Sequence, residues 1–292
     1  MRDSAPIGVF DSGLGGLTVA RALRAAMPAE SIVYFGDTAR LPYGSKSPAT
    51  VYSFARQCLR FLSGLSPKVL VVACNTASAL ALDSLREDFD VPVIGVLEPG
   101  AAAAVEVAER ASKAMGRIGL IATEATIASN AYAVAVHRRD PRLHVIGRAC
   151  PLLVPMIEEG REENDPIVRL ALAEYLKPFL ELQVSALILG CTHYPIFARA
   201  IGEVLGPQVR LIDSAEQTAL VVQRQLATMG TLNAETGATA GELTCYVTDQ
   251  GQRFERLASR FLGQPTGQPV WVTPEMLEEE ALVSRDPSKG RR

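Results

Sequence analysis

Short apolar runs alternate with longer helical patterns along most of the chain. The apolar runs are rich in β-branched residues and carry no alternating polar positions, as expected for parallel strands whose sheet is covered by helices on both faces. Stretches rich in Ala, Leu and Arg, such as residues 17–26 and 101–114, separate them. The pattern predicts an α/β protein, with strands at residues 7–10, 32–35, 69–73, 93–96, 118–121, 144–146, 186–189 and 209–212.

The same pattern indicates an internal duplication. The first, second and fourth runs recur after 111, 112 and 116 residues, and Cys74 is followed by Cys191 after 117 residues. The 292 residues also exceed the roughly 100–150 of a typical single domain. We therefore predict two similar parallel-sheet α/β domains related by pseudo-twofold symmetry, with the site between them. Pro-Gly at 99–100 and Gly-Pro at 206–207 mark the expected boundaries, so that residues 1–98 and 208–292 form a discontinuous first domain and residues 99–207 the second.

The third run of each half ends in a cysteine followed closely by a threonine. Cys74 precedes Asn75 and Thr76, and Cys191 precedes Thr192. Because ligands of open parallel sheets bind outside the carboxyl ends of the strands, the two halves predict two half-sites whose thiols face one ligand from opposite sides. Both cysteines precede apparent helix starts, which we expect to stabilise the thiolate form.

Composition and charge exclude several kinds of binding partner and structural class. The formal net charge is −3 without clustered Lys and Arg, so no basic surface for nucleic acid is predicted. No apolar run approaches the about 18 residues of a membrane span, which favours a soluble cytoplasmic protein. The five cysteines are irregularly spaced and form no Cys-x-x-Cys pair, which argues against a disulfide framework or a zinc ribbon. Cys58, Cys150 and Cys245 are interpreted as small core residues.

Two glycine-containing segments follow the first two runs. Residues 11–16 close the first run and open a helix; they form either a tight turn or a ligand-binding turn with accessible backbone N–H groups. Their spacing departs from the dinucleotide fingerprint, which disfavours NAD. Residues 36–44 form either a structured loop with an Asp37–Arg40 pair or part of the site.

Two further residues carry candidate chemistry. His193, two residues after Cys191, is either a structural histidine or a group that assists the thiol. Cys191 and His193 could form half a metal site, but no clustered second pair of ligands is present, so metal is disfavoured. Glu158 lies beside Glu159, and their position alone indicates a solvated helix end.

Four motifs together resemble bacterial glutamate racemases, members of the aspartate/glutamate racemase superfamily. They are GVFDSGLGG at residues 8–16, YFGDTARLPYG at 34–44, VACNTASA at 72–79 and LGCTHYP at 189–195. The resemblance runs from about residue 7 to about 213, is looser beyond that, and finds no counterpart for the extension after about 270. It implies a cytoplasmic, homodimeric enzyme that makes D-glutamate for peptidoglycan and needs no pyridoxal phosphate, metal or other cofactor.

The resemblance also implies roles for individual residues. Cys74 and Cys191 correspond to the catalytic thiols, with Cys74 deprotonating D-glutamate and Cys191 L-glutamate. Asp11 and His193 correspond to groups that assist them, and Glu158 to a supporting acid of the second half-site. The residues implied to bind substrate are Asp11, Ser12, Pro42, Tyr43, Gly44, Asn75, Thr76, Thr126, Thr192 and His193.

Two alternatives remain open at this point. One is a racemase of the same superfamily that acts on aspartate or a hydantoin. The other is a ligand-binding or inhibitory protein of the same fold, since some glutamate racemases also bind DNA gyrase. Exchange of the Cα proton with solvent separates an enzyme from a binding protein.

Overall fold

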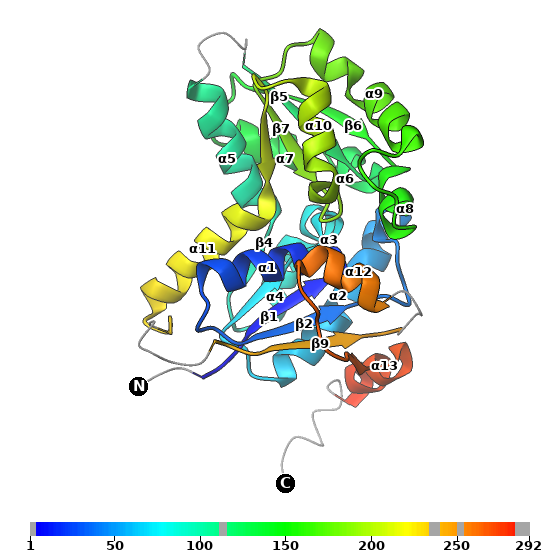
Figure 1. Ribbon diagram of the computed structural model, residues 1–292. Coiled ribbons are helices and arrows are strands. Elements are labelled where there is room, and N and C mark those ends of the chain that lie inside the picture. Colours follow the sequence, from blue (N-terminus) through cyan, green and yellow to red (C-terminus); the bar gives the residue numbers. More distant parts are fainter. Residues whose placement is uncertain (1–3, 111–115, 234–239, 250–253, 284–292) are drawn as a thin grey trace.

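Two parallel sheets build the molecule, one in each of the two lobes seen in Figure 1. The computed structural model describes residues 4–110, 116–233, 240–249 and 254–283. In the first sheet lie β1 (Ile7–Asp11), β2 (Ile32–Gly36), β3 (Val69–Val72), β4 (Val93–Gly95), β9 (Leu243–Val247) and β10 (Val270–Trp271). In the second lie β5 (Arg117–Ala122), β6 (His144–Ala149), β7 (Ala186–Gly190) and β8 (Arg210–Asp213).

The strand order repeats between the two sheets. The first sheet reads β10-β9-β2-β1-β3-β4 and the second β6-β5-β7-β8, so the core order of the first four strands recurs in the next four. All eight predicted runs coincide with strands, and β1, β3 and β7 are buried at every position, as continuous apolar runs require. The predicted class, two parallel-sheet α/β domains, is confirmed.

The chain crosses between the sheets at other points than those predicted. β8 pairs with β7, so residues 210–213 belong to the second sheet, although the prediction placed everything from residue 208 in the first domain. The reason is local: Gly206, with φ of +81°, ends a helix, and the Gly-Pro pair marks that helix end rather than a domain end. β9 and β10 then return to the first sheet. The discontinuous first domain stays a prediction, and residues 284–292 at the end of its second segment lie outside the described residues.

Helices cover both sheets. Around the first sheet are α1 (Leu17–Ala26), α2 (Pro48–Gly64), α3 (Asn75–Leu80), α4 (Leu82–Asp88), α12 (Phe254–Leu262), α13 (Pro274–Val283) and the short 3₁₀ helix η1 (Tyr43–Ser45). Around the second are α5 (Leu97–Arg110), α6 (Glu124–Ala128), α7 (Ala131–His137), α8 (Leu153–Glu158), α9 (Pro166–Glu181), α10 (Ala198–Leu205) and the 3₁₀ helix η2 (Tyr194–Phe197). α5 spans the predicted boundary at residues 98 and 99.

Polar caps set the starts of several helices. Ser47 Oγ accepts a hydrogen bond from the backbone N–H of Thr50, and Pro48 follows as the first residue of α2. Asp165 accepts from Ile167 N–H at 2.8 Å in the same way before Pro166 of α9. A side-chain acceptor followed by proline satisfies one exposed N–H and removes another, which fixes the first turn.

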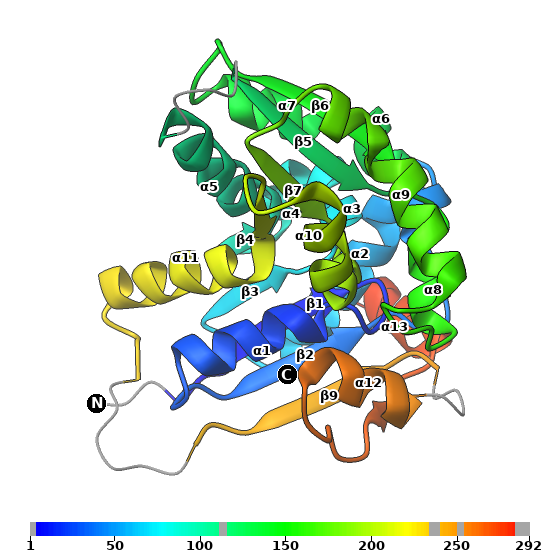
Figure 2. The ribbon, with the colours of Figure 1, turned by 45° about the horizontal axis from the view of Figure 1, so that its top comes forward.

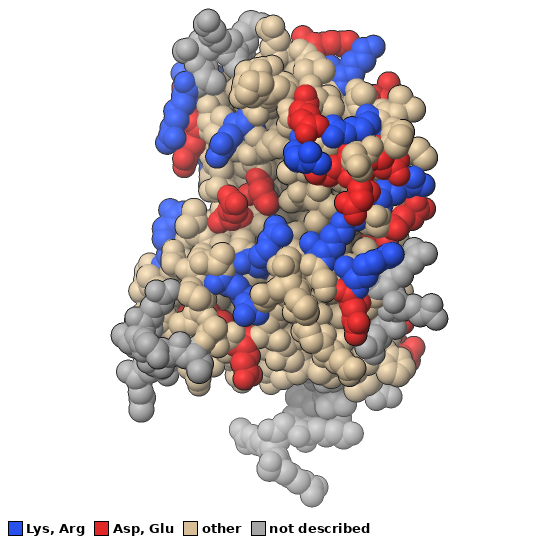
Figure 3. All heavy atoms as spheres, in the orientation of Figure 1, with Lys and Arg blue, Asp and Glu red and all other residues tan. Residues whose placement is uncertain are grey.

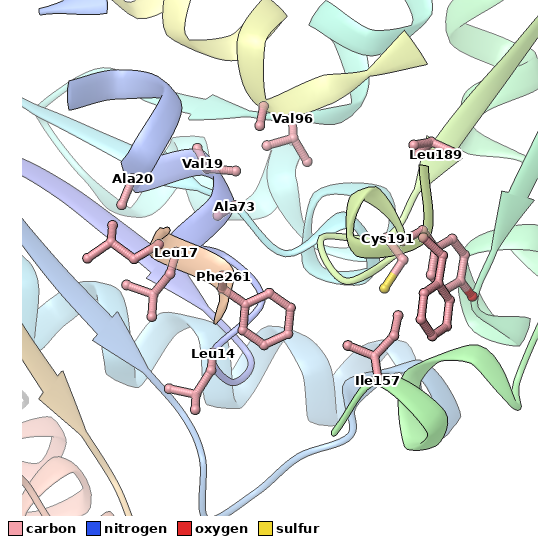
Figure 4. Packing of buried hydrophobic residues seen from close by; sticks show 14 of the residues in the cluster. Leu14, Leu17, Val19, Ala20, Ala73, Val96, Ile157, Leu189, Cys191 and Phe261 are labelled. Carbon is pink, nitrogen blue, oxygen red and sulfur yellow. The ribbon is translucent and has the colours of Figure 1, made fainter. Parts of the chain in front are cut away.

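One helix and one shared core hold the lobes together. α11 (Ser214–Met229) starts at the end of β8 and packs against α5 of the same lobe and against α1 of the other lobe (Figure 2). A single cluster of buried side chains joins residues of β1, β7 and α12, as Figure 4 shows around Cys191 and Phe261. The carboxyl ends of β3 and β7 are thereby brought toward one another across the lobe boundary.

The outer surface carries charges of both signs. On the face in Figure 3, Lys and Arg are interspersed with Asp and Glu on both lobes. Among the described residues, no helix combines the length and the apolar character needed to cross a membrane.

Candidate active site

A pocket between the lobes collects most of the residues implicated by the sequence. Both cysteines line it, each at the carboxyl end of a strand in a different sheet: Cys74 after β3 and Cys191 after β7. The other lining residues come from loops and helix starts of both lobes: Ser12, Gly13, Leu41, Pro42, Tyr43, Gly44, Asn75, Thr76, Thr123, Val154, Glu158, Thr192 and His193.

Cys74 is a buried thiol at the start of α3. Its Sγ–H donates to Ser12 Oγ at 3.3 Å. Burial and the negative charge of Asp11 raise the pKa of the Cys74 thiol to about 12, although hydrogen bonds from Ser12 and from the backbone N–H of Ala77 to the thiolate oppose the rise. The expected stabilisation by the helix start is therefore outweighed, and Cys74 is a protonated thiol at neutral pH.

Cys191 lies at one end of a hydrogen-bonded chain. Its Sγ is 3.8 Å from Nδ1 of His193, and Nε2 of His193 is 3.1 Å from Oε1 of Glu158. Burial would lower the pKa of His193, but the hydrogen bonds to Cys191 and Glu158 outweigh it and raise the pKa to about 10. The imidazole is therefore protonated at neutral pH, and a positive charge beside a sulfur stabilises its thiolate.

Glu158 is thus drawn into the site rather than into solvent. The position of the acidic pair favoured a solvated helix end, but only the adjacent Glu159 fits that description, because it is exposed and pairs with Arg161 at 3.0 Å. A different kind of helix start also follows Cys191: the 3₁₀ helix η2 comes before α10, and His193 rather than Cys191 is its first flanking residue.

Asp11 sits behind the pocket, not in its wall. The carboxylate is fully buried, its Oδ2 accepts from the backbone N–H of Gly13 at 3.1 Å, and its Oδ1 has no hydrogen-bond partner. Burial raises the pKa of Asp11, while the positive charge of His193 and nearby backbone N–H groups lower it. Asp11 acts on Cys74 through its charge, and its implied contact with a ligand stays a prediction.

The loop of residues 36–44 serves both of the roles considered for it. Arg40 pairs with the buried Asp37 at 2.8 Å, and the Tyr43 hydroxyl donates to the same carboxylate at 2.5 Å. The Tyr43 side chain is therefore held by Asp37, and this anchoring places residues 42–44 in the pocket wall.

Three threonines form a hydroxyl cluster at the lobe boundary. Thr76 Oγ1 lies 3.0 Å from Thr123 Oγ1 and 3.3 Å from Thr126 Oγ1. Thr126 is only 1% exposed and does not line the pocket, whereas Thr123, which the sequence analysis did not single out, does. The internal duplication could have identified Thr123, because it follows Ser12 after 111 residues. This is also the distance along the chain between the ends of β1 and β5.

A glycine allows the two lobes to meet at the second half-site. A Cβ on Gly15, before α1, would collide with the side chains of Thr192 and His193. Thr18 Oγ1 also contacts the carbonyl oxygen of Thr192 at 3.4 Å. The glycine-rich turn therefore makes room for the histidine of the other lobe, in addition to presenting Ser12 and Gly13 to the pocket.

Removing one hydroxyl should reveal how strongly the lobes are coupled at Asn75. The buried Tyr132 of α7 donates to Asn75 Oδ1 at 2.6 Å. In Tyr132→Phe the buried amide oxygen loses its partner, and we expect the free energy of unfolding to fall by about 1–3 kcal/mol in urea titrations. Tyr52→Phe is the control, because its partner Asp88 is partly exposed. Equal losses in the two variants would contradict a special role for this contact.

Known proteins resemble the chain over nearly its whole length. The family model for Asp/Glu/hydantoin racemases matches residues 17–222. The glutamate racemase of Geobacter metallireducens is 46% identical over 273 residues, which are 94% of this chain and 98% of that protein. The crystal structure of Francisella tularensis glutamate racemase in complex with D-glutamate superposes with a TM-score of 0.85 at 40% identity, covering 95% of this chain and 99% of that one.

A second solved structure agrees with the first. Thermus thermophilus glutamate racemase, in complex with β-chloro-D-alanine, has a TM-score of 0.80 at 46% identity and covers 94% of this chain and 100% of that one. The shared region includes both sheets and both pocket cysteines, so the likeness is not confined to one lobe. The chain therefore belongs to the glutamate racemases of the Asp/Glu/hydantoin racemase family and is an amino-acid racemase.

Proposed function

We propose that the protein interconverts L- and D-glutamate by a two-thiol acid/base mechanism. The observation that carries the proposal is the placement of Cys74 and Cys191 in one pocket, at equivalent strand ends of two sheets with the same strand order. Inversion at Cα needs one group to remove a proton from one face and another to deliver a proton to the opposite face. A thiolate and a thiol on opposite walls of a pocket meet that need.

Each turnover exchanges the protonation states of the two cysteines. With L-glutamate, the Cys191 thiolate takes the Cα proton, the electron pair of the broken C–H bond remains on the substrate, and the Cys74 thiol gives its proton to the other face. With D-glutamate the roles reverse, so Cys74 must be the thiolate. His193, held by Glu158, stabilises negative charge on Cys191, and Ser12 does so for Cys74.

Substrate binding is expected to complete the charge balance. Burial keeps the pKa of Cys74 at about 12, and the ammonium group of an amino acid bound beside it would favour the thiolate. Asn75, Thr76 and Thr192 line the same pocket and supply donors for a carboxylate and for the charge that develops at Cα. Glutamate is the proposed substrate because the Francisella tularensis relative was solved with D-glutamate.

The proposal extends to the setting of the reaction. We infer that neither pyridoxal phosphate nor a metal takes part, that the D-glutamate made supplies peptidoglycan synthesis, and that the enzyme works as a cytoplasmic homodimer. All five cysteines are free thiols, in keeping with a reducing compartment. Light scattering on the purified protein tests the dimer.

Solvent exchange at Cα tests the reaction itself. In heavy water, enzyme that has been dialysed against chelator and freed of pyridoxal phosphate is expected to convert L-glutamate to D-glutamate carrying deuterium at Cα, as seen by proton NMR and chiral chromatography. Aspartate should turn over far more slowly. If aspartate but not glutamate acquired deuterium at Cα, aspartate would be the substrate. If activity returned only after metal was added, the cofactor-free mechanism would be overturned.

A further inference from the structure

Helix α12 bridges the lobes at the second half-site. It follows β9 of the first sheet and packs against α1, yet Arg260 reaches to the other lobe. Its Nη1 donates to the carbonyl oxygen of Ile157 at 3.1 Å and its Nη2 to that of Arg161 at 2.6 Å. The Ile157 carbonyl lies in the last turn of α8 and also accepts from the Gly160 N–H, whereas the Arg161 carbonyl lies three residues beyond the helix. A cation is favourable at this C-terminal end of a helix.

The end of α8 carries the carboxylate that holds His193. Glu158 is the last residue of α8, and its Oε1 contacts Nε2 of His193. α8 has six residues and is followed by Gly160 with φ of +88°, so little of its own structure fixes the direction of the Glu158 side chain. The guanidinium of Arg260 supplies two attachment points, one at the residue before Glu158 and one three residues after it.

Phe261, the residue next to Arg260, contacts His193, the hydrogen-bond partner of Glu158. The ring of Phe261 meets the His193 imidazole edge to face, with centroids 4.9 Å apart and planes at 76°. Figure 4 shows Phe261 of α12 near Ile157 of α8 and Cys191, all in the same buried cluster. Two consecutive residues of the first lobe's polypeptide thus contact the helix that bears Glu158 and the ring of His193.

We propose that Arg260 is a positioning residue for the Cys191 half-site, fixing the end of α8 so that Glu158 orients His193 toward the sulfur. Because α12 belongs to the lobe that carries Cys74, the contact also ties the geometry of one half-site to the position of the other. The inference rests on the proposed two-thiol function. Arg260 touches neither thiol and acts only through α8 and Glu158.

The test compares Arg260→Met and Arg260→Lys with Arg256→Met, which removes an exposed arginine from the same helix. We expect Arg260→Met to lower kcat at least about 10-fold with a smaller change in KM, because misplacing a catalytic group costs turnover. Arg260→Lys, which keeps one donor, should recover part of the loss, and Arg256→Met should stay within twofold of the parent. If Arg260→Met does not fold, Phe261→Leu tests the neighbouring contact with the same expectation.

A second readout follows His193 directly. The chain has three histidines, and the NMR signal of His193 is identified by its absence in His193→Asn. Without a fixed Glu158, the pKa of His193 should fall from about 10 in Arg260→Met but not in Arg256→Met, because the hydrogen bond to Glu158 is one of the two that raise it.

Turnover and His193 titration in Arg260→Met that match Arg256→Met would overturn the inference. Failure of the parent enzyme to label glutamate at Cα would instead overturn the proposed function, and the titration would still decide the role of Arg260.

Discussion

Replacing either pocket cysteine, in Cys74→Ala or Cys191→Ala, is expected to lower glutamate racemisation by about 10²–10⁴-fold, the usual contribution of a positioned acid or base. Each variant retains a group on only one face of Cα. A proton removed by the remaining thiol can return to the same face but cannot be delivered to the opposite one. The loss should therefore appear in both directions for both variants, measured as initial rates from L- and from D-glutamate.

The matched control is Cys245→Ala. Cys245 is buried in β9 of the first sheet and does not line the pocket, so its removal costs core packing but no proton transfer. Thermal unfolding followed by circular dichroism shows whether each variant keeps its fold. Normal racemisation by folded Cys74→Ala or Cys191→Ala would refute the two-thiol mechanism, whereas equal losses in Cys245→Ala would point to packing instead.

The fold could be read from the sequence because its signals are local and repeated. Each strand is a short apolar run, and the recurrence of Ile7 at Ile118 and of Cys74 at Cys191 shows that two units share one strand order. The crossing after β8 could not be read, because Gly206 and Pro207 have the same composition whether they end a helix or a domain. Only strand pairing, a long-range property, decides between these outcomes.

The site was predictable to the extent that it lies at strand ends. Ser12, Asn75 and Thr192 lie within three residues of a strand end and line the pocket. The contribution of α12 could not be predicted, because Arg260 and Phe261 come from a segment after the recognisable motifs and reach His193 only through the packing of the two lobes. The pKa of Cys74 was misjudged for the same reason: burial and the charge of Asp11 outweigh the helix start, and burial depends on the whole fold.

Asp11→Asn and His193→Asn should each slow one direction of racemisation more than the other, by roughly 10²-fold in kcat. The charge of Asp11 disfavours the Cys74 thiolate, so its help to that base comes from position: it holds the Gly13 N–H, next to the Ser12 that contacts Cys74. His193 contacts Cys191 directly. We therefore expect Asp11→Asn to slow the direction in which Cys74 is the base, and His193→Asn the direction in which Cys191 is the base. The two enantiomers have equal free energies, so kcat/KM must change equally in both directions, and the asymmetry in kcat is accompanied by a compensating change in KM.

The pH dependence of the racemisation rate shows in which direction each substitution acts. A bell shape is expected in both directions, since one cysteine must be deprotonated and the other protonated, and its limbs belong to the coupled pair. The Asp11 charge helps to raise the pKa of Cys74, so Asp11→Asn should move the acidic limb of the Cys74-base direction to lower pH even as its maximum falls. Below about pH 10 His193 is a cation beside Cys191, so His193→Asn should lower the maximum of the Cys191-base direction over this whole range. Initial rates from each enantiomer between about pH 6 and pH 10 measure both effects. Equal losses of kcat in both directions for both variants, with an unshifted limb in Asp11→Asn, would leave the two thiols in place but remove Asp11 and His193 as their separate helpers.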